Sequence, residues 1–278
     1  MLRTATLATV AMLAFAANSV LARLALAGGS ADAFGYTGLR LLSGAAVLAL
    51  LVRLRHGHGV GGGWPAAAAL LGYALAFSLA YLMLGAATGA LILFATVQFG
   101  ILGWAILKRD RPSPPEWLGI AIALAALAWL LAPGLAAPSP AGAALMLAAG
   151  LCWAAYTLIG KSSSAPLADT AGNFLRCLPV AVPLLLAGIA RMTLAGAGYA
   201  ILSGAVASGL GYAVWYAVLP SLPRASAAYM QLTVPVITAA GGLVLLGEPL
   251  TSRLLLATAG ILGGVVLALV AAERRRSA

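Results

Sequence analysis

Two seven-residue stretches of this chain are nearly identical and lie 139 positions apart. Leu71 to Phe77 reads LGYALAF, and Leu210 to Tyr216 reads LGYAVWY. The offset is half of the 278 residues, which indicates an internal duplication, and a duplication dictates the architecture of both copies. Further residue pairs keep nearly the same offset: Arg40 with Arg176, Tyr73 with Tyr212, Phe77 with Tyr216, Thr96 with Thr233, and Gly119 with Ala257.

The composition places both copies in a membrane. The chain is 63% hydrophobic and 8% charged, with a mean hydropathy of +1.05, whereas soluble domains carry about 25% charged residues. Apolar runs of about 20 residues, bounded by charges or by Gly/Pro clusters, predict ten membrane spans. The predicted spans are 5–27, 33–53, 65–86, 88–107, 116–132, 141–160, 169–190, 196–218, 224–246 and 251–272.

Each half therefore holds five spans, and an odd number makes the second copy insert upside down relative to the first. Inverted repeats of this kind are typical of secondary transporters, with the substrate site near the bilayer midplane between the copies. We expect an all-α integral membrane protein of ten transmembrane helices. Residues 1–134 form the first five-helix repeat and residues 135–278 the second, inverted one.

The basic residues predict the orientation. If the N-terminus is cytoplasmic, eleven basic residues fall on the cytoplasmic side and only two, Arg191 and Arg253, on the outer side. The positive-inside rule therefore places both termini in the cytoplasm. The net charge of +10 does not indicate a nucleic-acid partner, because the basic residues sit at helix ends rather than in a patch. The cytoplasmic residues are Arg3, Arg53, Arg55, Lys108, Arg109, Arg111, Lys161, Arg224, Arg274, Arg275 and Arg276.

The first span could be mistaken for a signal peptide, because Arg3 and an apolar run precede Ala25-Leu26-Ala27. Residues 15–23 align with residues 153–161 of the second copy, so we expect the first span to be retained as a helix. Cys152 and Cys177 fall inside predicted spans and are expected to be small buried hydrophobic residues.

Aromatic residues gather on two equivalent spans. Tyr73, Phe77 and Tyr81 recur at intervals of four, so they share one face of the span 65–86. Tyr212, Trp215 and Tyr216 form the matching group. These side chains either pack helices together or line a cavity, and both interpretations stay open.

Polar residues inside the membrane are costly and mark pathways by default. Asn18 and Ser19 lie in the middle of the first span, Gln98 at the centre of the fourth, and Gln231 in the ninth. The alternative role is interhelical hydrogen bonding. Pro235 is predicted to kink the ninth span, as a gate or simply as a packing device.

Arg40 and Arg176 are each about seven residues inside a helix end. Their symmetric placement favours a repeated structural role, such as bonding helix-end carbonyl groups, over contact with an anionic substrate group. Small residues recur at Gly260 and Gly264, and along Ala200, Gly204 and Ser208. Both patterns fit either tight packing within the chain or a homodimer contact.

Acidic residues are missing from mid-membrane. Binders of permanent cations and proton-coupled antiporters usually need a carboxylate there, so we expect a neutral or zwitterionic substrate. Nor is there a Ser/His/Asp set, an HExxH motif or a paired carboxylate site, so we expect neither an enzyme nor a metal or other cofactor. The six acids, all in loops or at helix ends, are Asp32, Asp110, Glu116, Asp169, Glu248 and Glu273.

The chain resembles the EamA-type members of the drug/metabolite transporter superfamily in three features. These are ten spans in a five-plus-five repeat, an arginine in the second and seventh spans, and the segment Gly247-Glu248-Pro249-Leu250 before the last span. The resemblance covers essentially the whole chain. The counterpart of Gly247-Glu248 after the fourth span is Asp110-Arg111-Pro112, which departs from the family pattern. Within the family, the aromatic third and eighth spans are most similar to bacterial YddG-type exporters of aromatic and other amino acids.

The resemblance implies a multi-pass protein of the bacterial inner membrane that works by alternating access through a central cavity. The implied partners are the lipid bilayer and a small molecule, most of all an amino acid, with Pro235 as a hinge of the gating helix. Mapped onto this chain, the candidate substrate-binding residues are Asn18, Tyr73, Phe77, Tyr81, Gln98, Trp104, Trp153, Tyr156, Tyr212, Trp215, Tyr216, Tyr229 and Gln231.

Three other functions stay open. An exporter of hydrophobic drugs or quaternary cations shares the aromatic cavity but should want an embedded carboxylate. A nucleotide-sugar or sugar-phosphate carrier of the same superfamily should carry basic residues deep in the cavity, where only Arg40 and Arg176 are available. A membrane scaffold or lipid enzyme would show no solute flux at all.

Overall fold

The computed structural model describes residues 2–56, 59–109, 111–134, 137–161, 163–218, 221–222 and 230–277. Over these residues the chain is helical with no β-strand, which confirms the all-α membrane fold. Nine helical stretches of the described chain are long and apolar enough to cross a membrane. The elements are α1 (Leu2–Ala27), α2 (Ala33–His56), α3 (Trp64–Tyr81), α4 (Ala86–Leu107), α5 (Pro114–Leu131), α6 (Pro140–Gly160), α7 (Pro166–Gly188), η1 (Ile189–Arg191), α8 (Leu194–Ile201), η2 (Leu202–Leu210), α9 (Gly211–Val218), α11 (Val234–Leu246) and α12 (Ser252–Ser277).

The eighth predicted span is one continuous helical stretch with a change of winding. It runs through α8, then through η2, which is wound as a π-helix, and then through α9, over Leu194–Val218. π-helical turns are rare and often occur at functional sites. Here the wide turn carries Ser203 and Ser208 toward α1 and α2, as described below.

The ninth predicted span, 224–246, differs from expectation. Within the described residues, helix at Met230 and Gln231 gives way to a turn at 232–233, and α11 begins at Val234. Pro235 therefore lies in the first turn of α11 instead of kinking the middle of a long helix. The physical reason is that the first-turn position of a helix tolerates the missing N–H of proline.

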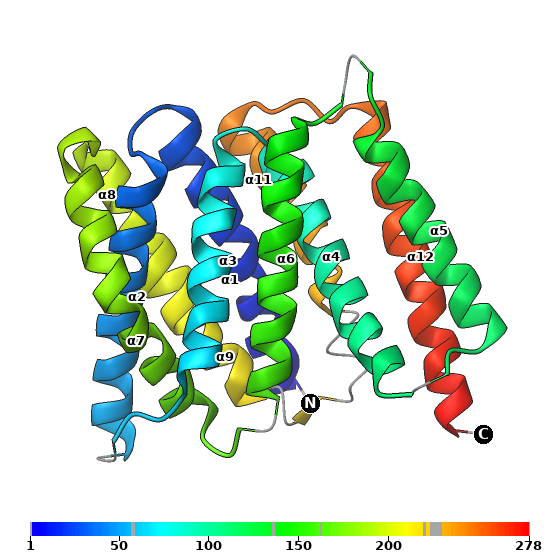
Figure 1. The fold of residues 1–278 in the computed structure, drawn as a ribbon, viewed down its shortest axis with the longest axis horizontal. Helices are drawn as coiled ribbons and strands as arrows, with labels where there is room; N and C mark the ends of the chain where they lie inside the picture. The colour runs from blue at the N-terminus through cyan, green and yellow to red at the C-terminus, as the bar shows by residue number, and fades with distance from the viewer. Residues whose placement is uncertain are drawn as a thin grey trace.

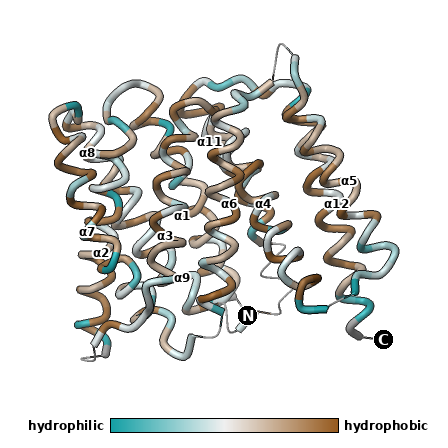
Figure 2. The backbone as a smooth tube through the Cα atoms, in the orientation of Figure 1, coloured by the Kyte–Doolittle hydropathy of each residue, from teal (hydrophilic) through white to brown (hydrophobic). Residues whose placement is uncertain are grey.

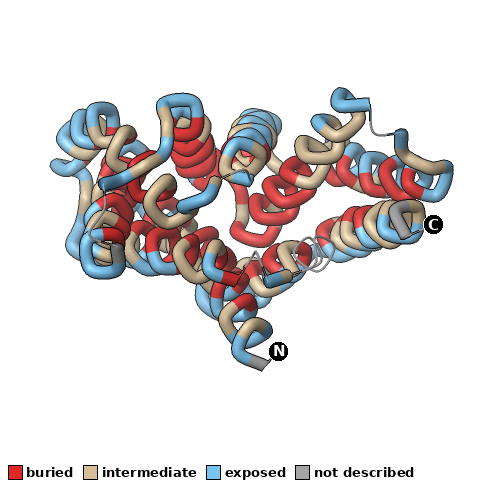
Figure 3. Tube along the Cα trace, turned by 90° about the horizontal axis from the view of Figure 1, so that it is seen from below, coloured by how far each residue is buried: buried red, intermediate tan, exposed pale blue. Residues whose placement is uncertain are grey.

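The helices pack in pairs that are far apart in the sequence. The largest contacts join α2 to α7, α5 to α12, and α3 to α6, and α4 also packs on α6. Helix α1 contacts α3, α4, α11 and the whole α8–α9 stretch, so it lies in the centre of the bundle. The α5–α12 pair stands at one edge, and α1 begins at the same end of the bundle at which α12 ends (Figures 1 and 3).

The helices are apolar along most of their length, and the hydrophilic residues gather toward the helix ends (Figure 2). Large aliphatic side chains are strongly exposed on the outer surface of the bundle, for example Leu107, Leu186 and Val244. A water-soluble monomer rarely shows so much contiguous apolar surface, so these side chains face lipid.

Small residues set the closest helix contacts. A Cβ atom added at Gly264 would lie 2.5 Å from the carbonyl oxygen of Gly119, and one at Gly260 would lie 2.6 Å from the Cβ of Ala126. The Gly260/Gly264 motif is therefore used within the chain, to bring α12 onto α5. Gly204 is likewise pressed against the backbone of α2 at Arg40.

The glycine-rich segment before α3 is fastened to α7. Gly62 N–H donates to the Asp169 carboxylate (2.8 Å), and Gly63 N–H donates to Asn173 Oδ1 (2.9 Å). The Arg176 guanidinium donates to the carbonyl groups of Gly61 (2.6 Å) and Gly172 (3.0 Å). Arg176 thus bonds backbone carbonyl groups, but they belong to the segment before α3 and to the interior of α7 and not to helix ends.

We predict that Gly264→Ala destabilises the α5–α12 contact, because the new methyl group would collide with the α5 backbone. Overpacking of this kind costs about 1–3 kcal/mol. Thermal unfolding of the purified protein in detergent should show a clear drop in the midpoint. The matched control is Gly263→Ala, one residue earlier on α12, because nothing lies within 4 Å of a Cβ there. Equal midpoints for the two variants would contradict this packing.

Candidate functional site

A small cavity lies at the centre of the bundle, where α1, α3, α4, α6 and α9 meet. Its volume is about 20 Å³, which is room for about one water molecule. A metabolite could enter only if the surrounding helices moved apart. The lining residues are Phe15, Asn18, Ser19, Tyr73, Phe77, Leu93, Phe94, Trp153 and Tyr212.

Aromatic rings form most of the cavity wall, and Trp153 stands at their centre. Its ring centroid is 4.8 Å from that of Tyr73 and 5.1 Å from that of Tyr212. These two residues occupy the same place in the two copies of the seven-residue repeat, so the repeat brings both of its tyrosines into contact with one tryptophan. Phe77 extends the wall 5.3 Å from Tyr73.

A chain of hydrogen bonds runs beside the cavity and joins four helices. Ser203 on η2 donates to Asn18 Oδ1 (2.6 Å), and Asn18 Nδ2 donates to the Tyr73 hydroxyl (3.1 Å). Arg40 on α2 also donates to the Tyr73 hydroxyl (3.1 Å) and, through Nε, to Ser208 on η2 (3.3 Å). We call these five residues the polar network. It gives Asn18 and Tyr73 fixed positions in the cavity wall.

Arg40 is the residue of this network that the sequence interpretation placed differently. Its partners are side chains, whereas its repeat partner Arg176 binds the backbone carbonyl groups of Gly61 and Gly172. Its guanidinium carbon lies 4.9 Å from the centroid of Phe77 and 5.2 Å from that of Tyr73, within cation–π range. Arg40 is 1% exposed and stands directly behind the two rings that line the cavity.

The structure brings four of the expected site residues onto the cavity wall besides Asn18: Tyr73, Phe77, Trp153 and Tyr212. Three more are buried against that wall. The ring of Tyr81 meets that of Phe77 edge to face (4.7 Å between centroids), and the ring of Tyr156 lies 5.4 Å from that of Trp153. The ring of Trp215 lies 6.0 Å from that of Phe15.

The remaining expected residues do not line the cavity. Trp104 is about half exposed on α4 with Lys108 over its ring, and Gln98, Tyr216 and Gln231 are half-buried elsewhere. Pro235 is buried in the first turn of α11. Tyr229 lies outside the described residues.

Sequence reasoning missed part of the wall. Phe15, Leu93 and Phe94 were absent from the expected set, although Phe15 lies three residues before Asn18 and Phe94 four residues before Gln98. Residues three or four apart share a helix face, so the periodicity around the polar residues carried a usable signal. Ser203 and Ser208 join the network from η2, whose π-helical winding nothing in the sequence indicated.

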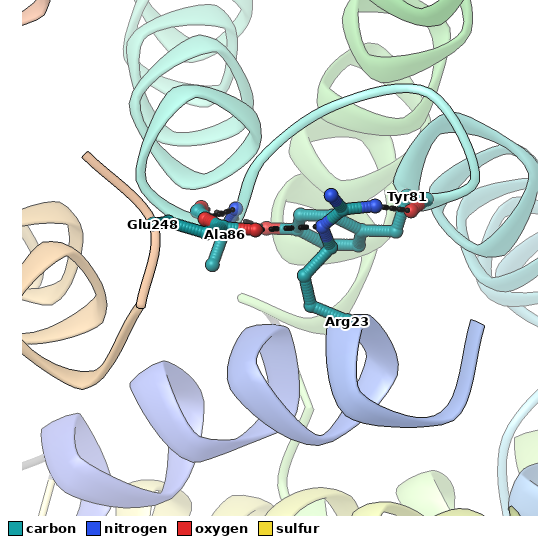
Figure 4. Close-up of polar contacts among 4 residues, drawn as sticks. All are labelled: Arg23, Tyr81, Ala86 and Glu248. Carbon is teal, nitrogen blue, oxygen red and sulfur yellow. Dashed lines mark hydrogen bonds and ion pairs between the residues drawn. The ribbon is translucent and has the colours of Figure 1, made fainter. Parts of the chain in front are cut away.

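A second polar cluster closes the end of the bundle opposite the termini. Arg23 near the end of α1 forms an ion pair with Glu248 (2.7 Å) and donates to the Tyr81 carbonyl at the end of α3 (2.9 Å). The other Glu248 oxygen accepts from the Ala86 N–H that opens α4 (2.7 Å). Figure 4 shows this contact, which we call the latch. Gly247, with φ of 64°, ends α11 and turns the chain so that Glu248 meets its partners.

The latch borders a hollow of about 210 Å³, larger than the central cavity. Its walls come from α1, α4, α11 and the segment that follows α11. Both charged side chains are about one-fifth exposed, so the ion pair is partly shielded from solvent. Among the described residues, no group of three or more His, Cys, Asp or Glu side chains gathers in a way that could hold a metal ion.

A double-mutant cycle should detect the latch. We expect a coupling energy of about 1–3 kcal/mol between Arg23→Ala and Glu248→Ala, because a partly buried ion pair with hydrogen bonds stabilises the fold more than an exposed ion pair does. The free energies of unfolding of the wild type, the two single variants and the double variant give the coupling. Additive effects would mean that the pair contributes nothing specific.

Comparisons with known proteins agree with this architecture. Residues 140–270 match the EamA-like transporter family. The chain is 52% identical to uncharacterized protein PA1977 of Pseudomonas aeruginosa, over 96% of this chain and 94% of that one. It is 29% identical to uncharacterized transporter YwfM of Bacillus subtilis, over 91% of this chain and 90% of that one. A solved crystal structure of another protein, 21% identical in sequence, has the same fold. The two structures superpose with a TM-score of 0.61, over 96% of this chain and 99% of the chain in the crystal structure.

Proposed function

This chain belongs to the EamA-like transporter family, and on that premise we propose that it exports small metabolites, above all amino acids with aromatic or other large side chains. That it is a membrane transporter of the drug/metabolite transporter superfamily follows from the family and from the transporter YwfM. The substrate class is our proposal. The observation that carries it is the aromatic cavity with a polar network along one side.

The cavity wall suits an amino acid in two respects. Trp153, Phe77 and Tyr212 offer aromatic faces to an apolar side chain, and aromatic contacts of this kind contribute about 0.5–1.5 kcal/mol beyond burial. Asn18, Ser19 and the Tyr73 hydroxyl offer hydrogen bonds to its polar end. This combination of apolar walls and few placed polar groups is typical of small-molecule sites.

We place the termini in the cytoplasm and the latch at the outer face, in the inner membrane of a bacterium. Helices α2, α4 and α6 end at the same end of the bundle at which α1 begins and α12 ends (Figure 1). That end therefore carries the basic residues Arg3, Arg53, Lys108 and Lys161, and the positive-inside rule places it in the cytoplasm. The two named relatives come from bacteria. The helix pairing also supports two inverted repeats. In such a repeat α3 corresponds to the α8–α9 stretch and α6 corresponds to α1, so the contact of α3 with α6 should have a counterpart between the α8–α9 stretch and α1. Both contacts are present.

Transport through this site requires the helices to alternate between two arrangements. The described structure has a cavity too small for a metabolite, and its outer end is held by the latch. We propose that breaking the Arg23–Glu248 pair frees α4 and α11 to move away from α1. The turn at 232–233, with Pro235 just after it, interrupts the helix and is the point about which α11 would pivot in this motion.

We predict that Trp153→Ala lowers the rate of uptake of labelled aromatic amino acids into proteoliposomes at least tenfold, because it removes the centre of the cavity wall. The matched control is Trp104→Ala, since Trp104 is exposed on α4 away from the cavity. Both variants should purify as monodisperse protein. Unchanged uptake in Trp153→Ala, or equal loss in both variants, would overturn the assignment of the cavity as the substrate site.

We predict that Glu248→Gln opens the outer end. In a variant without native cysteines, Ser19→Cys reports access to the cavity, because Ser19 lines it. A membrane-impermeant maleimide added outside should label this cysteine about fivefold faster after Glu248→Gln, which corresponds to a loss of about 1 kcal/mol of latch energy. The control is Glu116→Gln, which breaks a similar pair with Arg275 at the opposite end. Equal labelling rates in all three proteins would contradict the gating role.

A further inference from the structure

Arg40 carries a positive charge in the middle of the bundle, almost sealed from the surroundings. It is 1% exposed, and arginine stays protonated in proteins. Nε and one Nη nitrogen donate to Ser208 and Tyr73, which are neutral hydroxyl groups. The other nitrogen, Nη1, is buried and has no hydrogen-bond partner among the described residues. A buried charge of this kind is normally paired, because the desolvation cost is otherwise large.

None of the acidic side chains that the structure describes is in a position to compensate Arg40. Within the described chain, Glu248 binds Arg23, Glu116 binds Arg275, and Asp32 and Asp169 receive backbone N–H groups at the ends of helices. Glu273 lies in the last turns of α12, and Asp110 lies outside the described residues. The described acidic residues therefore leave the charge of Arg40 uncompensated, which points to an anionic ligand.

The positive charge is transmitted to the cavity wall. Tyr73 Oη accepts hydrogen bonds from both Arg40 and Asn18, so its two acceptor positions are used and its own proton is left to donate. Tyr73 lines the cavity, and Arg40 stands behind its ring and that of Phe77. Hydrogen bonds to charged groups are shorter and about twice as strong as neutral ones. A carboxylate oxygen is thus the acceptor that this side of the wall fits best.

We propose that the cavity binds its substrate through a carboxylate group, held by the Tyr73 hydroxyl and Asn18 and attracted by the buried charge of Arg40. The inference rests on the proposed function, in that it takes the cavity to be the transport site. Tyr73 and Asn18 would contact the substrate, and Arg40 would act through Tyr73 as a positioning residue. Since the described residues that line the cavity include no acidic one, the ammonium group of an amino acid is dispensable for binding, and permanent cations are expected to be rejected.

Binding to the purified protein tests this without depending on flux. The probes are the carboxylates 3-phenylpropionate and phenylalanine, the neutral 3-phenylpropanamide and the cation phenylalaninamide. The readout is quenching of tryptophan fluorescence. The variant Trp153→Phe shows whether the signal comes from the cavity. We expect the two carboxylates to bind at least about tenfold more tightly than the amides, because a unit charge acts strongly through a low-dielectric wall.

Two variants identify the groups responsible. Asn18→Asp places a carboxylate of nearly the same shape beside Tyr73, so it should abolish the preference for carboxylates and improve binding of phenylalaninamide. Tyr73→Phe removes one hydroxyl and keeps the ring, and it should reduce carboxylate binding about tenfold. The control is Asn173→Asp, the same change on α7, where Asn173 holds the Gly63 amide. It should leave the preference unchanged.

Amides that bind as tightly as the carboxylates would overturn the inference, as would an undiminished preference in Asn18→Asp. The two proposals fail separately. Carboxylate-selective binding without flux of amino acids would refute the proposed substrates but support the carboxylate site. Flux of phenylalanine and its amide at equal rates would support an amino-acid carrier and refute the carboxylate site. Repeating the binding with chloride replaced by a bulky sulfonate, which is not a carboxylate, shows whether an inorganic anion occupies the same place, since chloride would then have weakened the binding of the carboxylate probes.

Discussion

Close backbone contact through small residues is the constraint on which this fold depends. In lipid, apolar side chains gain little by leaving one apolar surface for another, so helices associate through van der Waals packing and hydrogen bonds. Gly38 at the α2–α7 contact, Gly204 at the η2–α2 contact, and Gly119 and Gly264 at the α5–α12 contact leave no room for a Cβ atom. These contacts hold the outer helices in place, and α1 and the cavity lie among them.

The polar network is a local exception to the apolar interior. Burying Arg40, Asn18 and two serines costs free energy, and this cost is reduced only where the buried groups form hydrogen bonds with one another. The network achieves this for most of its atoms by drawing donors and acceptors from α1, α2, α3 and η2. It thereby fixes the relative positions of helices from both halves of the chain beside the cavity.

Hydropathy and the repeat predicted the helices well, because a membrane requires long apolar helices whatever their neighbours are. The aromatic pair Tyr73 and Tyr212 was also predictable, since both copies carry it at the same place. The role of Arg40 was not. Its sequence position matches that of Arg176, but Arg176 faces the backbone of a docked loop while Arg40 faces tyrosine and serine side chains. The π-helical winding of η2 and the break before Pro235 are changes of backbone hydrogen bonding within one span, which hydrophobic periodicity does not report.

The pairing of α5 with α12 has a consequence for synthesis of the protein. About 120 residues separate the end of α5 at Leu131 from the start of α12 at Ser252. At about 5–20 residues per second, a ribosome needs on the order of ten seconds to make that interval. During it, α5 waits in the bilayer with the Gly119 face uncovered and Glu116 without Arg275. The α5–α12 contact at the edge of the bundle is therefore the last helix contact to form. A chaperone or the insertion machinery would act on the uncovered face of α5 during that interval.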